Sequence, residues 1–234
     1  NIGRGFHSND ARGTTIRIDP KTGDPADRVT PLVRSTGSEL GIRTEIIPGL
    51  QSSLAWWQLK LDSELLFVGD AGTTEASRPS KRFGVEWSNH YIINRNLLLD
   101  LDLATSRARF QGNDPAGNRI PGAPDRVASF GITLTDVGPW SAGAQLRYFG
   151  PRPLIEDNSV RSASTTLVYA RAGYQLNRNL KINLDVFNLL NRKNSDIDYF
   201  YTSRLPGEAA EGVADTHFHP VESRSFRLTF TARF

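Results

Sequence analysis

The chain has 234 residues, 38% of them hydrophobic and 23% charged, and a net charge of +3 with both signs interspersed, which gives no support to nucleic-acid binding. It contains no cysteine, which excludes disulfide scaffolds, thiolate metal sites and cysteine nucleophiles. Its mean hydropathy is −0.40, and the absence of an apolar run of about 18 residues excludes a transmembrane helix but not a transmembrane β-barrel.

Residues 1–37 are assigned to a loop region that precedes the first predicted strand. From there on, nearly every apolar segment alternates with a period of two, which is typical of β-strands, and helical periodicity is nowhere sustained. The predicted strands, about nine in number, cover residues 38–47, 51–69, 80–93, 96–110, 125–136, 139–150, 163–176, 179–190 and 226–234. The fold class is therefore all-β and antiparallel.

Each predicted strand has one apolar and one polar face. In the last strand, Phe226 and Leu228 alternate with Arg227 and Thr229. In residues 51–69 the apolar face is assigned to Trp57, Leu59, Leu61, Leu65 and Phe67. The charged residues assigned to the polar faces are Arg43, Lys60, Arg147, Arg171, Arg227, Arg233, Glu39, Glu45, Glu64, Glu86, Asp62, Asp100, Asp102 and Asp185.

The connections between predicted strands alternate between short turns and long loops. Turns near residues 48–49, 94–95, 137–139 and 177–178 are followed by loops at about 70–79, 111–124, 151–162 and 191–222. Outer-membrane barrels have this arrangement, with short periplasmic turns and long extracellular loops. Residues 1–37 are then extracellular, and residues 38–234 form the transmembrane strands.

Strand length and charge support a membrane barrel. A tilted strand needs roughly 9 to 11 residues to cross the bilayer, which these segments supply. Lys or Arg facing lipid at the midplane costs about 2–4 kcal/mol, so the charged faces are predicted to line the lumen. Aromatic residues predict two interfacial girdles, with Trp57, Tyr91, Trp140, Tyr174 and Phe234 at the periplasmic end and Phe67, Tyr148 and Phe149 at the outer end.

Several segments together resemble the carboxy-terminal part of a TonB-dependent outer-membrane receptor. They are GFHSNDARG (5–13), ELGIR (39–43), RFGVE (82–86) and LDVFNLLN (184–191), with a last strand that ends at Phe234. The resemblance covers nearly the whole chain. It implies a multi-pass barrel of 22 strands in the bacterial outer membrane, plugged by an amino-terminal domain. Such a receptor imports a siderophore–iron complex or a similar scarce nutrient with energy from TonB.

The resemblance also implies partners and a place for this chain within the receptor. The partners are the TonB complex, reached through the plug, the barrel assembly machinery, outer-membrane lipids and a small ligand such as a siderophore. Phe234 is expected to act as the membrane insertion signal. Because signal peptide, TonB box and plug are not found in the sequence, the chain is expected to be a fragment without its plug and earlier strands. The charged lumen wall is expected to hydrogen-bond the plug.

Candidate ligand-binding residues lie in three loop groups. They are His7, Asp10 and Arg12; Arg152 with Tyr199 and Tyr201; and Asp215, His217 and His219. In an extended backbone the last three would point to one side, which suits a weak metal or ligand site. The alternative, which the sequence favours, is that they are solvated loop residues before Pro220. The His7 group can instead serve loop packing. Arginines in the extracellular loops, Arg152, Arg161, Arg192 and Arg204, together with the two tyrosines can hold an anionic iron chelate by charge and stacking.

Other function classes have less support. No catalytic residue set, resident metal site or cofactor is predicted, because a phosphate loop, a dinucleotide loop and a nucleophile elbow are all missing. A passive porin would need an even, closable number of strands. A soluble all-β binding module, such as a lectin-like sandwich, would need its apolar faces buried in a dry interior. An enzyme built on an outer-membrane barrel would need a catalytic set.

Overall fold

The computed structural model describes residues 1–234 except residues 10, 20–22, 27, 64 and 69–72. One antiparallel sheet dominates it. In spatial order this sheet contains β1 (Ile2–Ser8), β2 (Leu32–Thr44), β3 (Leu50–Leu61), β6 (Ser80–Asn94), β7 (Leu97–Phe110), β8 (Arg126–Val137), β9 (Trp140–Phe149), β10 (Thr165–Gln175), β11 (Leu180–Phe187) and β14 (Ser225–Ala232).

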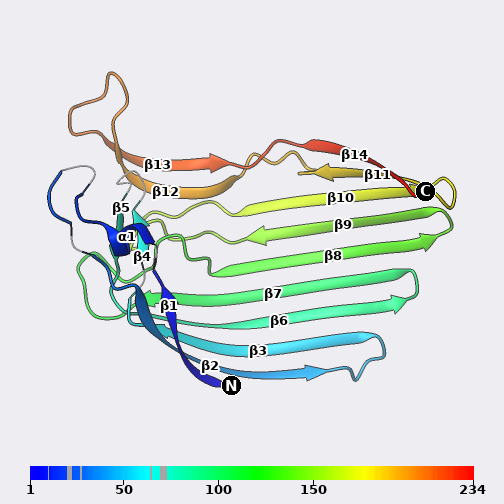
Figure 1. Ribbon diagram of the computed structural model, residues 1–234, viewed down its shortest axis with the longest axis horizontal. Coiled ribbons are helices and arrows are strands. Elements are labelled where there is room, and N and C mark those ends of the chain that lie inside the picture. The colour runs from blue at the N-terminus through cyan, green and yellow to red at the C-terminus, as the bar shows by residue number, and fades with distance from the viewer. Residues whose placement is uncertain (10, 20–22, 27, 64, 69–72) are drawn as a thin grey trace.

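The remaining elements lie at one rim of this sheet. They are the helix α1 (Ala11–Thr15) and two hairpins, β4 (Leu65–Val68) with β5 (Thr73–Ala76) and β12 (Ser195–Ser203) with β13 (Val213–Pro220). Among the described residues, no helix has the length and apolar character needed to cross a bilayer. Figure 1 shows the long connections together at the rim near α1, and the short turns together at the opposite rim.

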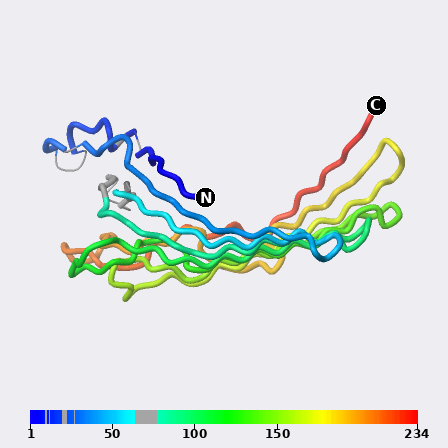
Figure 2. Tube along the Cα trace, turned by 90° about the horizontal axis from the view of Figure 1, so that it is seen from below, coloured from blue at the N-terminus to red at the C-terminus, as the bar shows by residue number. Residues whose placement is uncertain are grey.

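The sheet is a curved wall with two edges. Every neighbouring pair of strands is antiparallel, and β1 and β14 lie at the ends of the strand order. Figure 2 shows the sheet bent into a trough, with its middle strands at the bottom. An all-β antiparallel segment of a transmembrane barrel was predicted, and the structure confirms it.

The sheet has ten strands rather than about nine. The additional strand is β1, which lies in the stretch assigned to a loop and pairs with β2 from Ile2↔Ser38 to Ser8↔Leu32. Its sequence, IGRGFHS, has too few alternating apolar residues to stand out. Residues 51–69 were predicted as one strand, but they form β3 and β4 as separate elements. Within the loop predicted at 191–222, the structure places the β12–β13 hairpin.

The two faces of the sheet differ in polarity. Leu103, Phe130 and Leu184 share the apolar face, whereas Asp102 and Asp185 lie on the other face. One groove is lined by both Asp102 in β7 and Asp185 in β11, so the charged face is the concave side of the curved sheet. The charged face therefore lines the lumen, and the apolar, convex face meets lipid, as predicted.

The face assignment was wrong for β3. Trp56 pairs with Leu40 and Val85 on the convex face, whereas Trp57 pairs with Glu39 and Gly84 on the concave face. Both phases of this strand carry apolar side chains, so alternation alone did not fix the register, and a slip of one residue exchanges the faces. Lys60 consequently lies on the convex face and not on the lumen wall. A Cβ at Gly84 would lie only 2.9 Å from the Trp57 ring, so the indole fits there because residue 84 is glycine.

Aromatic side chains mark the rim with the short turns. Tyr91, Trp140 and Tyr174 all lie on the convex face near strand ends, and the Trp140 and Tyr174 ring centroids are 4.6 Å apart. At the other rim Tyr148 faces outward, but Phe149 pairs with Val127 and Thr165 on the concave face, so its girdle assignment was wrong. The Phe67 side chain is outside the described part of the structure. Phe234 lies beyond the end of β14 and is fully exposed.

Candidate functional site

The concave wall carries a groove of about 920 Å³ that spans β7 to β11. Asp102, Arg147, Tyr169, Arg171 and Asn183 are among its lining residues. The predicted wall residues found on the concave face are Arg43, Arg147, Arg171, Arg227, Glu39, Glu86, Asp100, Asp102 and Asp185. Glu45, Asp62 and Arg233 lie just beyond strand ends, and Glu64 is outside the described residues.

Opposite charges neutralise each other along this wall. The Arg171 Nε donates to Asp185, which also lies directly across from Arg227. Further along, the His90 Nδ1 and the Asp100 Oδ1 are within hydrogen-bond distance at 2.6 Å. Acidic and basic side chains are interspersed on the wall, which is therefore a polar lumen surface of mixed charge.

The long loops pack on one another at the loop-bearing rim. The Arg78 Nη2 donates to the Gly117 carbonyl at 2.9 Å and to Glu156, and its guanidinium lies 5.0 Å from the centre of the Phe110 ring. Ala108, Phe110 and Ile120 form a small buried cluster beneath them. The β7–β8 and β9–β10 loops are thereby held as one packed unit.

A buried ion pair attaches the β12–β13 hairpin to this unit. The Arg152 Nη2 donates to the Asp198 Oδ2 at 2.7 Å, and the two side chains are only 16% and 5% exposed. The Asn194 side chain donates to the Ser164 carbonyl at 3.0 Å, and the Thr165 hydroxyl donates to the Ser195 carbonyl at 2.7 Å. Asp198 was not predicted as a site residue. The local sequence carries no signal for it, because its partner Arg152 is 46 residues away and only the fold brings the two together.

Five of the predicted candidates gather on one face of the hairpin. Tyr199 pairs with His217 and Tyr201 pairs with Asp215, while His219 follows two residues further along the same strand. Paired residues of antiparallel strands, and residues two apart, share a face. The rings of Tyr201 and His217 stack at 3.8 Å with an angle of 4° between their planes. Asp198 lies on the opposite face, so the ion pair leaves this aromatic face uncovered by Arg152.

The other candidates do not join this face. His7 lies in β1 opposite Val33, at the far end of the strand order, and Figure 2 shows the N-terminal segment and the β12–β13 hairpin on different sides of the trough. Asp10 is outside the described residues. Arg12 lies in α1, and its side chain is outside the described part of the structure. Arg161, grouped in the sequence with Arg152, instead pairs with Asp125.

The geometry does not support a metal-binding site at Asp215, His217 and His219. Within the described ranges, no group of three or more His, Cys, Asp or Glu side chains is placed to hold a metal ion. The Asp215 carboxylate instead accepts the backbone N–H of Thr216 at 2.6 Å. The His217 Nε2 is buried without a hydrogen-bond partner, as its ring is covered by Tyr201. The hairpin face is therefore an aromatic and hydrogen-bonding surface.

The chain matches a family model and a characterised receptor. The model described as "TonB dependent receptor-like, beta-barrel" matches residues 1–189. The catecholate siderophore receptor Fiu of Escherichia coli K12 is 34% identical over 119 residues, which make up 49% of this chain and 14% of that receptor.

Solved structures share the fold over the full length of this chain. The closed form of the ferric-catecholate import receptor Fiu from E. coli K12 has a TM-score of 0.70 at 21% identity, and the chain covers 32% of it. The ferric yersiniabactin uptake receptor FyuA from Yersinia pestis has a TM-score of 0.71 at 18% identity, with 34% covered. The copper transporter OprC has a TM-score of 0.70 at 20% identity, with 37% covered. This chain thus spans about one third of the length of these proteins.

Proposed function

Because this chain belongs to the TonB-dependent receptor family and forms outer-membrane barrel strands, we propose that it is the part of a receptor that helps capture an iron–siderophore complex. Energy for import would come from TonB through a plug domain that contacts the concave wall. The mixed charges of that wall suit such a contact, since their partners can be exchanged for hydrogen bonds to a plug. The family consists of transporters and not enzymes.

The observation that carries this proposal is the aromatic face of the β12–β13 hairpin, defined as Tyr199, Tyr201, Asp215, His217 and His219. It lies at the rim with the long loops, which is the extracellular side of such a barrel. Flat rings such as the Tyr201–His217 stack offer a platform for an aromatic chelate. A relative that is 34% identical over part of the chain is a catecholate siderophore receptor, which supports a ligand of this type.

Phe234 and the N-terminal group have separate proposed roles. Phe234, exposed past β14, would be read by the barrel assembly machinery as an insertion signal. His7 and Arg12 belong to the segment β1–α1, and we keep them, with Asp10, as secondary candidates for ligand contact. Neither role is needed for the hairpin face to bind a chelate.

Removing the stacked pair is expected to weaken chelate binding selectively. The double substitution Tyr201→Ala and His217→Ala should raise the Kd of a ferric catecholate chelate by roughly tenfold or more, since aromatic anchors dominate such contacts. The matched control is Phe218→Ala, which removes an exposed ring from the opposite face of the same hairpin. Titration of the full chain in detergent, followed by fluorescence quenching, provides the affinities. Equal Kd values for the double variant and the parent would place the site elsewhere.

A further inference from the structure

Cations lie side by side on the convex face near the loop-bearing rim. Lys81 pairs directly with Lys60 on one neighbouring strand and with Arg109 on the other. Two residues along β7, Arg107 pairs with Phe83 on the same face. Like charges directly opposite each other destabilise a sheet. An anion bound against this row of cations would relieve the repulsion between them.

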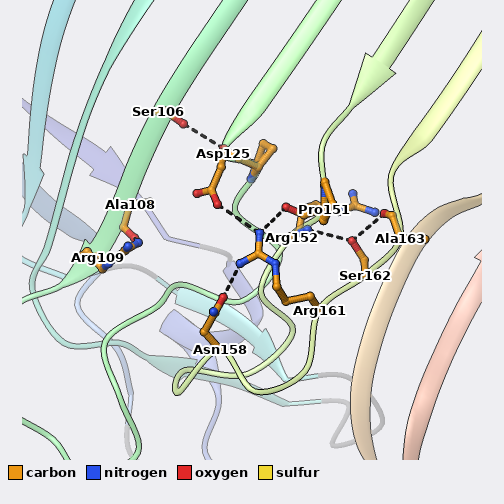
Figure 3. Close-up of polar contacts among 11 residues, drawn as sticks. Ser106, Ala108, Arg109, Asp125, Pro151, Arg152, Asn158, Arg161, Ser162 and Ala163 are labelled. Atoms are coloured by element: carbon orange, nitrogen blue, oxygen red, sulfur yellow. Dashed lines mark hydrogen bonds and ion pairs between the residues drawn. The ribbon is translucent and has the colours of Figure 1, made fainter.

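Beside this row the surface is hollowed into a pocket of about 550 Å³. Five arginines and one aspartate are among its lining residues, which come from β7, β8 and the two neighbouring long loops. We name the basic cluster as Lys81, Arg107, Arg109, Arg119, Arg126 and Arg161. Figure 3 shows Arg161 reaching toward Asp125 at the start of β8, with Arg109 on the neighbouring strand.

Few of these charges are compensated within the protein. Asp125 accepts from the Arg161 Nη2 at 3.2 Å, and the same nitrogen donates to the Pro151 carbonyl at 2.7 Å. Arg109 donates to the carbonyl of its neighbour Ala108. Across the part of the chain that the structure describes, no carboxylate pairs with any other member of the basic cluster. The nearby acids Asp114 and Glu156 already pair with Arg78.

The position of the basic cluster along the strands places it at the boundary between the lipid hydrocarbon and the headgroups. Arg107 lies opposite Phe83, and the Lys81 ammonium is 6.0 Å from the centre of that ring. Arg126 is two residues beyond Ala128, which pairs with the outward-facing Tyr148. Below these residues the convex face is apolar. Aromatic side chains and snorkelling cations mark the boundary between hydrocarbon and headgroups, here on the extracellular side.

We propose that the basic cluster binds the phosphate groups of a phosphorylated glycolipid of the outer leaflet. Guanidinium groups match phosphate oxygens in bidentate geometry, and the pocket brings several of them together. A soluble anion would meet only the pocket. An amphiphile would also lay its acyl chains on the apolar belt directly beneath. The bound headgroup would cross-link β7, β8 and the β9–β10 loop from outside, on the face opposite the lumen.

The test measures the affinity of the full chain in detergent micelles for fluorescent bis-phosphorylated lipid A. The variant Arg107→Gln/Arg126→Gln removes two charge-assisted contacts, and binding is expected to weaken about a hundredfold. The control Arg95→Gln/Arg178→Gln removes two exposed arginines from turns at the opposite rim and should bind like the parent. The charge-conserving variant Arg107→Lys/Arg126→Lys keeps both charges but loses the bidentate geometry, so its affinity should lie between those of the parent and the Gln variant. For the parent protein, fully dephosphorylated lipid A should bind about as weakly as the Gln variant binds the phosphorylated lipid.

Three results would overturn the proposal. One is equal affinity of the parent for phosphorylated and dephosphorylated lipid, which needs no variant and is unaffected by any folding defect. Another is equal loss in the control variant. The third is displacement of the lipid by inorganic phosphate at equal concentration, which would identify a simple anion site. Because chelate binding uses the hairpin face, the Gln variant should keep the parent's Kd for a ferric chelate, and this separates the present proposal from the proposed function.

Discussion

Arginine in place of Leu101 or Leu184 is expected to block assembly of the chain in the outer membrane. Both leucines lie near the middle of their strands on the convex face, Leu101 across from Phe130 and Leu184 across from Leu228. A lipid-facing arginine at the midplane costs about 2–4 kcal/mol, and the double variant should lose roughly twice that. The measurement is the amount of heat-modifiable, protease-resistant barrel in purified outer membranes, made with the receptor that contains this chain.

The matched control is Asp102→Arg, one residue from Leu101 on the concave face. Its side chain is exposed to the lumen, so the variant should assemble at close to the parent level. Asp185 is a poor control, because it is 7% exposed and accepts from Arg171. Comparable losses for Leu101→Arg and Asp102→Arg would show that the two faces meet the same medium.

Truncation of Arg152 to alanine is expected to release the β12–β13 hairpin from the rim. It would leave the Asp198 carboxylate, 5% exposed, without its cation. Breaking a buried pair from one side costs about 3–5 kcal/mol. Hydrogen exchange should show this as faster opening of the hairpin amides, with unchanged protection in β7 and β8. The affinity for a ferric chelate should fall as well, since the aromatic face loses its fixed position.

A double substitution distinguishes the effect of an unpaired buried charge from the effect of lost packing volume at the Arg152–Asp198 contact. Arg152→Met with Asp198→Leu removes both charges and keeps apolar volume, so hairpin protection should return toward the parent value. If Arg152→Ala alone leaves hairpin exchange unchanged, then the hydrogen bonds from Asn194 and Thr165 hold the hairpin without the ion pair.

The alternation of side chains made most of the wall predictable. In β14 only one phase is apolar, and in β7 the stretch from Leu99 to Leu103 alternates strictly with Asp100 and Asp102, so strand, face and medium all followed from the sequence. In β3 the neighbours Trp56 and Trp57 made both phases apolar, and only the pairing with Leu40 and Glu39 decided between them. The strand β1 shows little alternation of apolar and polar residues. Its pairing with β2 depends on backbone hydrogen bonds, which the side-chain pattern does not predict.

The site was predictable only in part. Asp215, His217 and His219 were expected on one side of an extended backbone, and β13 provides it. Their meeting with Tyr199 and Tyr201 required the register of a hairpin inside a segment assigned to loop. The ion pair of Arg152 with Asp198 and the pocket around Arg109 both join segments that are distant in sequence. Such contacts produce no periodic pattern in the local sequence, so they could not be predicted from it.

The most direct test is the accessibility of single spin labels at positions 99 to 104 along β7, in the full chain reconstituted in bilayers. Labels at Leu99, Leu101 and Leu103 should collide with oxygen dissolved in the hydrocarbon. Labels at Asp100, Asp102 and Ala104 should collide with a water-soluble nickel chelate. Plotted against residue number, the two collision rates should each oscillate with a period of two residues and be out of phase with each other. Equal access of the nickel chelate to all six positions, or the reverse phase, would contradict it.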